Sequence, residues 1–376
     1  MGRYKTKDPE CGTINTAIFG LSKMRYLWIP CKILAVIMLL SLLVSAGYTG
    51  YMDVTGPNPV SIMFAGDILL DRGVGDAIEK NGKYYPYGEI KKILQQADIS
   101  AANLECPLTE RGIPSLKNRH LVFRADTGNA YALKDAGFDL LNLANNHAMD
   151  YGHTGLDDTL NALKKVGIMT VGAGLDSAAA RQPVFIEKNG LKLGFLGYST
   201  FPGEGYFYFS DRPDVCRADV SCLSEEINRA REKCDILVVS FHWGKEFDFY
   251  PSADQQELAH LAVDGGADIV IGHHPHVLQG VEEYKDRLIF YSLGNFVFDR
   301  QIPEGTDETV MVCISVTGDG ISSAEIIPVM INSCRPEEAG GESATYVLER
   351  MKLYSKRFGT AIEIKGDRGY IFFDIL

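Results

Sequence analysis

Five apolar segments of this sequence end abruptly in side chains that bind metal ions. Runs of this length and composition predict buried β-strands. The segments and their terminal residues are "SIMFAGD" with Asp67, "ISAANLE" with Glu105, "LLNLANNH" with Asn146 and His147, "ILVVSFH" with His242, and "DIVIGHHPH" with His273, His274 and His276. Because α/β sheets bind ligands outside the carboxyl ends of their strands, we expect these side chains to share one site. Any one of them alone fits a polar turn or a core histidine better, so the prediction depends on their recurrence.

The chemistry of these side chains indicates the kind of metal. Carboxylate, amide oxygen and imidazole together suit Mn, Fe or Zn better than a soft thiolate site would. His274 and His276 alternate on a nearly extended segment, so they can face two neighbouring ions. The sequence therefore predicts two divalent metal ions and leaves their identity open.

The rest of the chain alternates between extended and amphipathic helical segments. Asn189-Gly190 lies between two strand-like segments in 183–199, which predicts a hairpin. Further strands are expected at 60–67, 138–144, 168–174, 234–244, 267–274, 287–298, 310–316 and 324–331, and helices at 128–137, 154–167, 256–266 and 344–359. Mixed strands with helices outside them predict an α/β sandwich over 60–333, followed by a C-terminal helical extension over 334–376.

The amino-terminal part has a different character. Residues 33–52 contain no charged residue. As a helix, this span is about long enough to cross the ~30 Å core of a bilayer. Basic residues predominate before this span, so we expect a cytoplasmic tail (1–26), a transmembrane signal-anchor (27–52), a linker (53–59) and an extracellular remainder in a single-pass membrane protein. A signal peptide cleaved near Ala46 is the alternative, which would give a secreted protein, and translation could start at Met1 or Met24.

Charge and cysteine content narrow the function classes. The net charge is −12 and no basic stripe follows residue 32, so nucleic acid is excluded as an expected partner. The same charge disfavours a surface that attracts a polyanion over long range, and any such contact should be local. None of the eight cysteines forms a CxxC pair, so no zinc knuckle is indicated, and a disulfide remains possible.

Several ordered motifs resemble the CapA/PgsA family of bacterial poly-γ-glutamate capsule biosynthesis proteins. They are "FAGDILLDR", "NLECPLT", "LNLANNHAMDYG", "VVSFHWGKEF", "GADIVIGHHPHVLQGVE" and "IFYSLGNFVFD", and they run from about residue 60 to 300. The resemblance implies relation to calcineurin-like metallophosphoesterases, with a four-layer αββα sandwich and a two-metal site. It also implies a membrane-anchored, outward-facing component of capsule biosynthesis or export, which would meet poly-γ-glutamate synthase or export subunits and an anionic polymer or envelope substrate.

The resemblance assigns roles to individual positions. One metal would be held by Asp67 and His276, and the other by Asn146, His242 and His274. Glu105 would bridge the two metals. His147 would be the catalytic proton donor. Three further residues could hold the ligands in position without binding the metal themselves: Asp71, His273 and Asn295.

Two departures from the wider superfamily leave the activity open. The wider superfamily usually has a histidine ligand two residues after the first aspartate, but here Asp67 is followed by Ile68 and Leu69. Its bridging residue is usually aspartate, and here it is Glu105. Two alternatives therefore remain. One is a metal-dependent hydrolase of a phosphodiester, ester or amide in the envelope, and the other is a non-catalytic accessory subunit of a polymer synthase.

Overall fold

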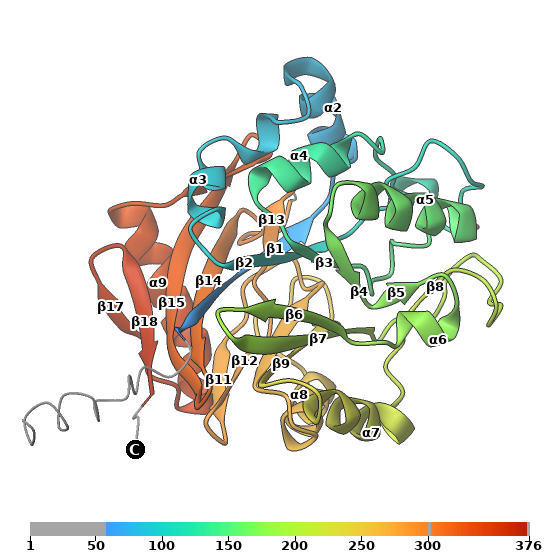
Figure 1. Ribbon diagram of the computed structural model, residues 1–376. Coiled ribbons are helices and arrows are strands. Elements are labelled where there is room, and N and C mark those ends of the chain that lie inside the picture. Colours follow the sequence, from blue (N-terminus) through green and yellow to red (C-terminus); the bar gives the residue numbers. More distant parts are fainter. Residues whose placement is uncertain (1–57, 300–301, 374–376) are drawn as a thin grey trace, which may run out of the picture. The chain divides into compact units, whose positions relative to one another are not determined.

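The computed structural model describes residues 58–299 and 302–373, which form two large β-sheets with helices outside them (Figure 1). The expected cytoplasmic tail and signal-anchor, and most of the expected linker, lie outside the described residues. Within the described ranges, no helix is long and apolar enough to cross a membrane.

The larger sheet has ten strands, and those toward one end of its order run parallel. In spatial order it contains β17 (Glu363–Lys365), β18 (Arg368–Phe372), β15 (Gly320–Asn332), β14 (Glu308–Thr317), β1 (Val60–Ile68), β2 (Ile99–Leu104), β3 (Leu140–Asn142) and β4 (Met169–Val171), with β13 (Asn295–Val297) beside β1 and β16 (Arg335–Glu338) beside β15. Strands β1, β2, β3 and β4 run parallel, so their carboxyl ends share one edge.

The second sheet has six strands. Its order is β11 (Val281–Tyr284), β12 (Arg287–Phe290), β10 (Ile269–His273), β9 (Ile236–His242), β7 (Leu191–Ser199) and β6 (Val184–Lys188). Strands β7, β9, β10 and β12 are parallel, so this sheet also gathers its central carboxyl ends at one edge. A two-stranded pair, β5 (Ala173–Gly174) and β8 (Asp214–Val215), lies apart from both.

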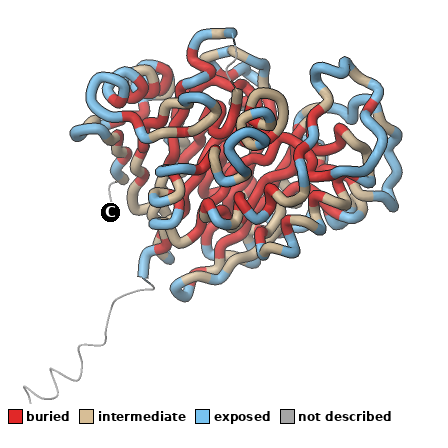
Figure 2. Tube along the Cα trace, turned by 90° about the horizontal axis from the view of Figure 1, so that it is seen from above, coloured by how far each residue is buried: buried red, intermediate tan, exposed pale blue. Residues whose placement is uncertain are grey.

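Three hydrophobic clusters divide the domain into four layers. On β1, Ile62 and Phe64 belong to the cluster between the two sheets, whereas Met63 and Ala65 belong to the cluster on the outer face of the larger sheet. This alternation follows from the two-residue period of a strand. Figure 2 shows the buried residues gathered in the middle of the domain, with the exposed residues along its periphery. All three clusters lie within residues 60–371, so this part of the chain contains its own complete core.

Helices cover the outer face of each sheet (Figure 1). The larger sheet is covered by α2 (Arg72–Asn81), α3 (Ile90–Leu94), α4 (Asn129–Ala136) and α5 (Gly152–Lys165), and the smaller by α7 (Val220–Arg231) and α8 (Ala253–Asp264). The short α6 (Ser177–Ala180) packs beside β5. The predicted α/β class is confirmed, and the layers are those of an αββα sandwich.

The C-terminal segment contains more than the expected helix. Helix α9 (Glu342–Ser355) buries Val347, Leu348 and Met351 in the cluster between the sheets. Strand β18 pairs with β15, and β17 pairs with β18, so the segment also extends the larger sheet. The sequence predicted neither these short strands nor helices α2 and α7.

Two local predictions can be checked directly. Asn189 and Gly190 connect β6 to β7 with φ angles of 50° and 84°, as the predicted two-residue hairpin requires. The six cysteines of the described residues, including Cys216 and Cys222, are free thiols.

Candidate metal centre

The carboxyl ends of the parallel strands bring the expected ligands together in the interior. Asp67 lies near the end of β1, Glu105 directly follows β2, and His242 ends β9. Asn146 and His147 lie in the turn after β3, and His274 and His276 follow β10. Asp67 and His242 are fully buried, and Glu105, His147, His274 and His276 are each at most 6% exposed.

Two groups of donor atoms share one carboxylate. Glu105, His242 and His274 offer ligand atoms that all lie within 4.8 Å of one another, and so do Asp67, Glu105 and His276. The Nδ1 atom of His274 is buried and has no hydrogen-bond partner among the described residues. A buried imidazole nitrogen without a partner is costly unless it ligates. The donor set therefore fits two neighbouring divalent cations with Glu105 between them.

Asn146 adds a neutral oxygen to the first group. Its Oδ1 lies 2.8 Å from Nε2 of His242, and that same nitrogen lies 3.6 Å from Oε1 of Glu105. The amide oxygen thus faces the same space as the imidazole and the carboxylate. The structure brings Asn146 to the centre, and its role as a ligand remains a prediction.

Asn103, which the sequence analysis missed, lies among the ligands. Its Nδ2 donates to Asp67 Oδ1 at 2.9 Å, and it lies 3.5 Å from Glu105 Oε2. Its Oδ1 accepts hydrogen bonds from Asn142 and Asn145, each at 3.1 Å. The spacing in "NLE" contains the signal, because residues two apart on a strand share one face. Asn103 therefore ties the carboxylates of two strands to the turn that carries Asn146.

The three residues expected behind the ligands lie in different places. His273 Nδ1 is 3.1 Å from Asp67 Oδ1, and Asn295 Oδ1 is 2.9 Å from His276 Nδ1. Because Asn295 contacts Nδ1, the other ring nitrogen of His276, Nε2, faces Glu105 at a distance of 3.7 Å. A group behind a histidine ligand typically fixes the orientation of its ring in this way. Asp71 instead caps α2 and accepts hydrogen bonds from the backbone N–H groups of Arg72 and Arg124.

The backbone around the two histidines is strained. His274 has a φ of 96° and His276 a φ of 59°, values that L residues seldom adopt. The turn is held by the backbone N–H of His274, which donates to Asp67 Oδ2 at 3.1 Å, and by the carbonyl of Pro275, which accepts from Phe247. Strain of this kind costs about 1–3 kcal/mol per residue and typically occurs at functional sites.

Burial sets the protonation of the metal-free centre. It raises the pKa of Glu105 well above its usual value, and the negative charge of Asp67 adds to the rise. Burial also lowers the pKa of His242 well below its usual value and that of His274 to about 3, with neighbouring histidines contributing. For Asp67, burial acts to raise the pKa. The hydrogen bond and charge of His273, the charge of His276 and the backbone N–H of His274 together outweigh burial and lower the pKa. The imidazoles of His242 and His274 are thus neutral and able to ligate at neutral pH.

His147 lies beside the centre and has its own partners. Its Nδ1 lies 2.9 Å from Oδ2 of Asp150, a buried carboxylate that also pairs with Lys117. Lys117 donates to the Asn146 carbonyl at 3.2 Å, and the ring of Phe123 packs on the His147 ring at 4.5 Å between centroids. Because Nδ1 is engaged by Asp150, Nε2 is the nitrogen left for chemistry. The sequence analysis did not single out Asp150 or Lys117.

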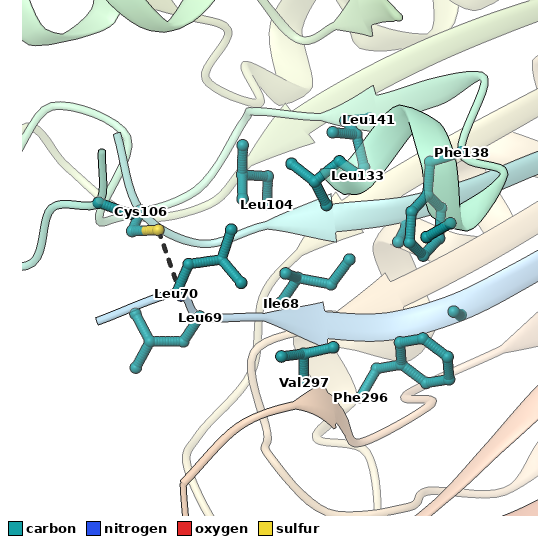
Figure 3. Packing of buried hydrophobic residues seen from close by; sticks show 14 of the residues in the cluster. Ile68, Leu69, Leu70, Leu104, Cys106, Leu133, Phe138, Leu141, Phe296 and Val297 are labelled. Carbon is teal, nitrogen blue, oxygen red and sulfur yellow. Dashed lines mark hydrogen bonds between the residues drawn. The ribbon is translucent and has the colours of Figure 1, made fainter. Parts of the chain in front are cut away.

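The residues after Asp67 cannot supply a further ligand. Ile68 and Leu69 are fully buried in the hydrophobic cluster on the outer face of the larger sheet, where Figure 3 shows them among Leu70, Leu104 and Phe296. The position two residues after Asp67 is therefore filled by a leucine in an apolar environment.

Comparison with known proteins identifies the family. Residues 61–300 match the family described as bacterial capsule synthesis protein PGA_cap. The chain is 33% identical over 313 residues to the PGA biosynthesis protein CapA of Bacillus subtilis (strain 168), covering 83% of this chain and 82% of that protein. It is 32% identical over 344 residues to the capsule biosynthesis protein CapA of Bacillus anthracis, covering 88% and 80%.

Among solved structures, a hypothetical protein from Thermus thermophilus aligns with a TM-score of 0.40 and 18% identity, over 74% of this chain and 96% of that chain. The match over residues 61–300 and the two relatives place the chain in the bacterial capsule synthesis PGA_cap family.

Proposed function

We propose that this protein is a membrane-anchored, outward-facing component of poly-γ-glutamate capsule biosynthesis or export that contains a dinuclear metal site of metallophosphoesterase type. The proposed capsule role is supported by the two Bacillus relatives, which are named as PGA and capsule biosynthesis proteins. The anchor and the orientation come from the uncharged span at residues 33–52 and the basic residues before it. The partners would be the subunits that synthesise or export the polymer.

One observation carries the metal site: Glu105 belongs to both groups of donor atoms. Asp67 and His276 would complete one ion's ligand set, and His242, His274 and Asn146 the other. Two divalent cations held in this way would supply Lewis-acid stabilisation of a ligand oxyanion. The buried, uncharged imidazoles of His242 and His274 need no deprotonation before they bind metal.

His147 would act on the bound substrate without ligating. Asp150 orients its ring through Nδ1, and Nε2 is the nitrogen from which a proton would pass to a leaving group, or to which one would return. Phe123 packs on the ring and limits its rotation. The class of reaction that fits these parts is hydrolysis of a phosphodiester, ester or amide bond in the envelope.

A second candidate is a non-catalytic accessory subunit of the polymer synthase. The observation that favours it is Leu69, which occupies an apolar environment at the position where the wider superfamily has a histidine ligand. In that case the centre would bind metal for structure, and the side chain of His147 would be dispensable.

Complementation of a deletion strain separates the two candidates. Asn146→Ala should lower metal content, whereas His147→Ala should keep the metal and lose capsule, because a positioned proton donor contributes about 10²–10⁴-fold to a rate. Surface polymer and bound metal are measured on the same cells. Full capsule from a stably expressed His147→Ala variant leaves only the accessory function.

Topology needs a separate measurement. A reporter fused after Leu376 should be active only outside the cytoplasm and should sediment with membranes. A released mature form that starts near Gly47 would instead establish cleavage of a signal peptide.

A further inference from the structure

Arg72 lies next to the metal centre, although neither the family resemblance nor the ligand set gives it a role. It follows Asp71 at the start of α2, five residues after Asp67. Its guanidinium lies over two aromatic rings that pack on His147 and His276, which places this cation beside the centre.

Two aromatic rings connect the Arg72 guanidinium to residues of the centre. It lies 5.1 Å from the ring of Phe123 and 5.2 Å from the ring of Phe298. Phe123 packs on His147 at 4.5 Å, and Phe298 packs on His276 at 5.0 Å. The guanidinium is thus placed by the same rings that border the expected proton donor and one of the expected ligands.

The conformation of Arg72 is unfavourable in two ways. Its φ is 52°, in the left-handed region that a long side chain seldom adopts. Its Nε is shielded from solvent and has no acceptor among the described residues, a cost of about 1–3 kcal/mol. Its Nη2 group does have an acceptor, the carboxylate of Asp299. Local penalties that the fold does not relieve typically mark a functional position.

We propose that Arg72 binds an oxyanionic group of the ligand that reaches the metal centre. A planar guanidinium matches the geometry of a carboxylate or a phosphoryl group and can bind either with two hydrogen bonds. Its side chain is 31% exposed, so an edge is accessible while the rest is held in place. A local cation of this kind also lets a chain of net charge −12 accept an anionic ligand. This inference rests on the proposed metal centre and names the class of group bound beside it.

The test uses a fragment of residues 55–376, which contains all three hydrophobic clusters, loaded with Mn²⁺. Inorganic phosphate and a short γ-linked glutamate oligomer are titrated separately by calorimetry. Arg72→Gln should keep its metal and its unfolding temperature but bind a probe about 10- to 100-fold more weakly, the equivalent of a hydrogen bond between charged groups. Arg72→Lys, which keeps the charge without the planar fork, should fall between Arg72→Gln and the wild type.

The control is Arg229→Gln on α7, an exposed arginine paired only with Glu225 in the described structure, which should bind both probes as the wild type does. If Arg72→Gln weakens the binding of phosphate alone, the ligand group is a phosphoryl group. If it weakens the binding of the oligomer alone, the ligand group is a carboxylate. If it weakens the binding of both, Arg72 belongs to a general oxyanion site. Each of these three results supports the proposal.

The inference is overturned if the Mn²⁺-loaded wild type binds neither probe, or if Arg72→Gln binds both unchanged. It is also overturned if Arg72→Gln loses metal together with probe, since Arg72 is then structural. If Arg72→Gln does not fold, Arg72→Lys decides, and wild-type affinity for both probes rejects the inference. A wild type that takes up no Mn²⁺ refutes the metal centre itself, and the oxyanion site with it.

Discussion

Asn103 donates a hydrogen bond of 2.9 Å from its side-chain amide to Asp67, and the two residues are direct partners in the register of β1 and β2. The contact makes Asn103 a support for the ligands from inside the sheet. Asn142 and Asn145 fix the other end of the amide, so its orientation is determined.

Asn103→Ala should therefore weaken both metal binding and the fold. Loss of a group that orients a ligand typically reduces metal affinity about 10- to 100-fold. The buried partners left without a hydrogen bond should lower the free energy of unfolding by about 1–3 kcal/mol. Metal titration and urea unfolding measure the two effects. Asn161→Ala on the exposed face of α5 is the control and should change neither.

The sequence singled out side chains that the structure brings together but not the groups that contact them, for a physical reason. Asp67, Glu105, His242 and the two histidines after β10 each interrupt an apolar run, which makes them visible one strand at a time. Asn103 lies inside such a run, and its importance depends on Asp67 in the neighbouring strand. Lys117 reaches His147 from a loop thirty positions away in the chain. Contacts of that kind depend on three-dimensional packing and leave no local pattern.

The predictions of secondary structure show the same division. The long central strands and the Asn189-Gly190 turn follow from local pattern and turn chemistry. Strand β18 has no clear alternation of its own and is a strand because β15 offers it an edge to pair with. Helix α7 was missed although Leu223 and Ile227 bury one face of it on the smaller sheet.

The stability of the metal-free domain should fall as pH rises, because of Glu105. Burial, together with the charge of Asp67, raises the pKa of Glu105 in the folded state above its value in the unfolded chain. The folded state therefore binds this proton more tightly, and the stabilisation is complete at pH values below the pKa of an unfolded glutamate. It is lost as pH rises through the raised pKa of the folded state.

Glu105→Gln should remove this dependence. We expect the variant, in the presence of chelator, to be more stable than the wild type at neutral pH by about 1–3 kcal/mol, the usual cost of an uncompensated buried polar group. The measurement is urea unfolding of both proteins from about pH 4 to about pH 8. Glu349→Gln, at an exposed position on α9, is the control. A stability difference between Glu105→Gln and wild type that does not change with pH would contradict the assignment.

Replacing His274 and His276 together by alanine should remove bound transition metal and leave the domain folded. His274 belongs to one group of donor atoms and His276 to the other, so each ion would lose one of its protein ligands. Alanine is also strained at the positive φ angles of positions 274 and 276, so we expect the substitutions to give no gain in stability. Metal content by mass spectrometry and circular dichroism are the measurements. His260→Ala on α8, where the imidazole pairs with Glu282, is a control that should keep its metal.

In the metal-free domain, Lys117 should help to lower the pKa of His147. Burial lowers the pKa of His147; the hydrogen bond and charge of Asp150 oppose that effect, and the positive charge of Lys117 adds to it. Removing Lys117 takes away a repulsive charge and leaves the Asp150 carboxylate to interact with His147 and the backbone N–H of Phe123. In the metal-free domain, Lys117→Met should therefore raise the pKa of His147, and Asp150→Asn should lower it further than in the wild type.

The opposite signs make this prediction specific, because a general loosening of the fold would move the pKa of His147 toward its usual value in both variants. NMR titration of the imidazole nitrogens gives the pKa directly. Lys117→Met should also cost about 3–5 kcal/mol of stability, since it leaves the buried carboxylate of Asp150 without its cation. Lys117→Arg, which keeps the charge, should leave the pKa of His147 low. If Lys117→Met and Asp150→Asn shift that pKa in the same direction, Lys117 does not set the protonation of His147, and its contact with the Asn146 carbonyl becomes its main role.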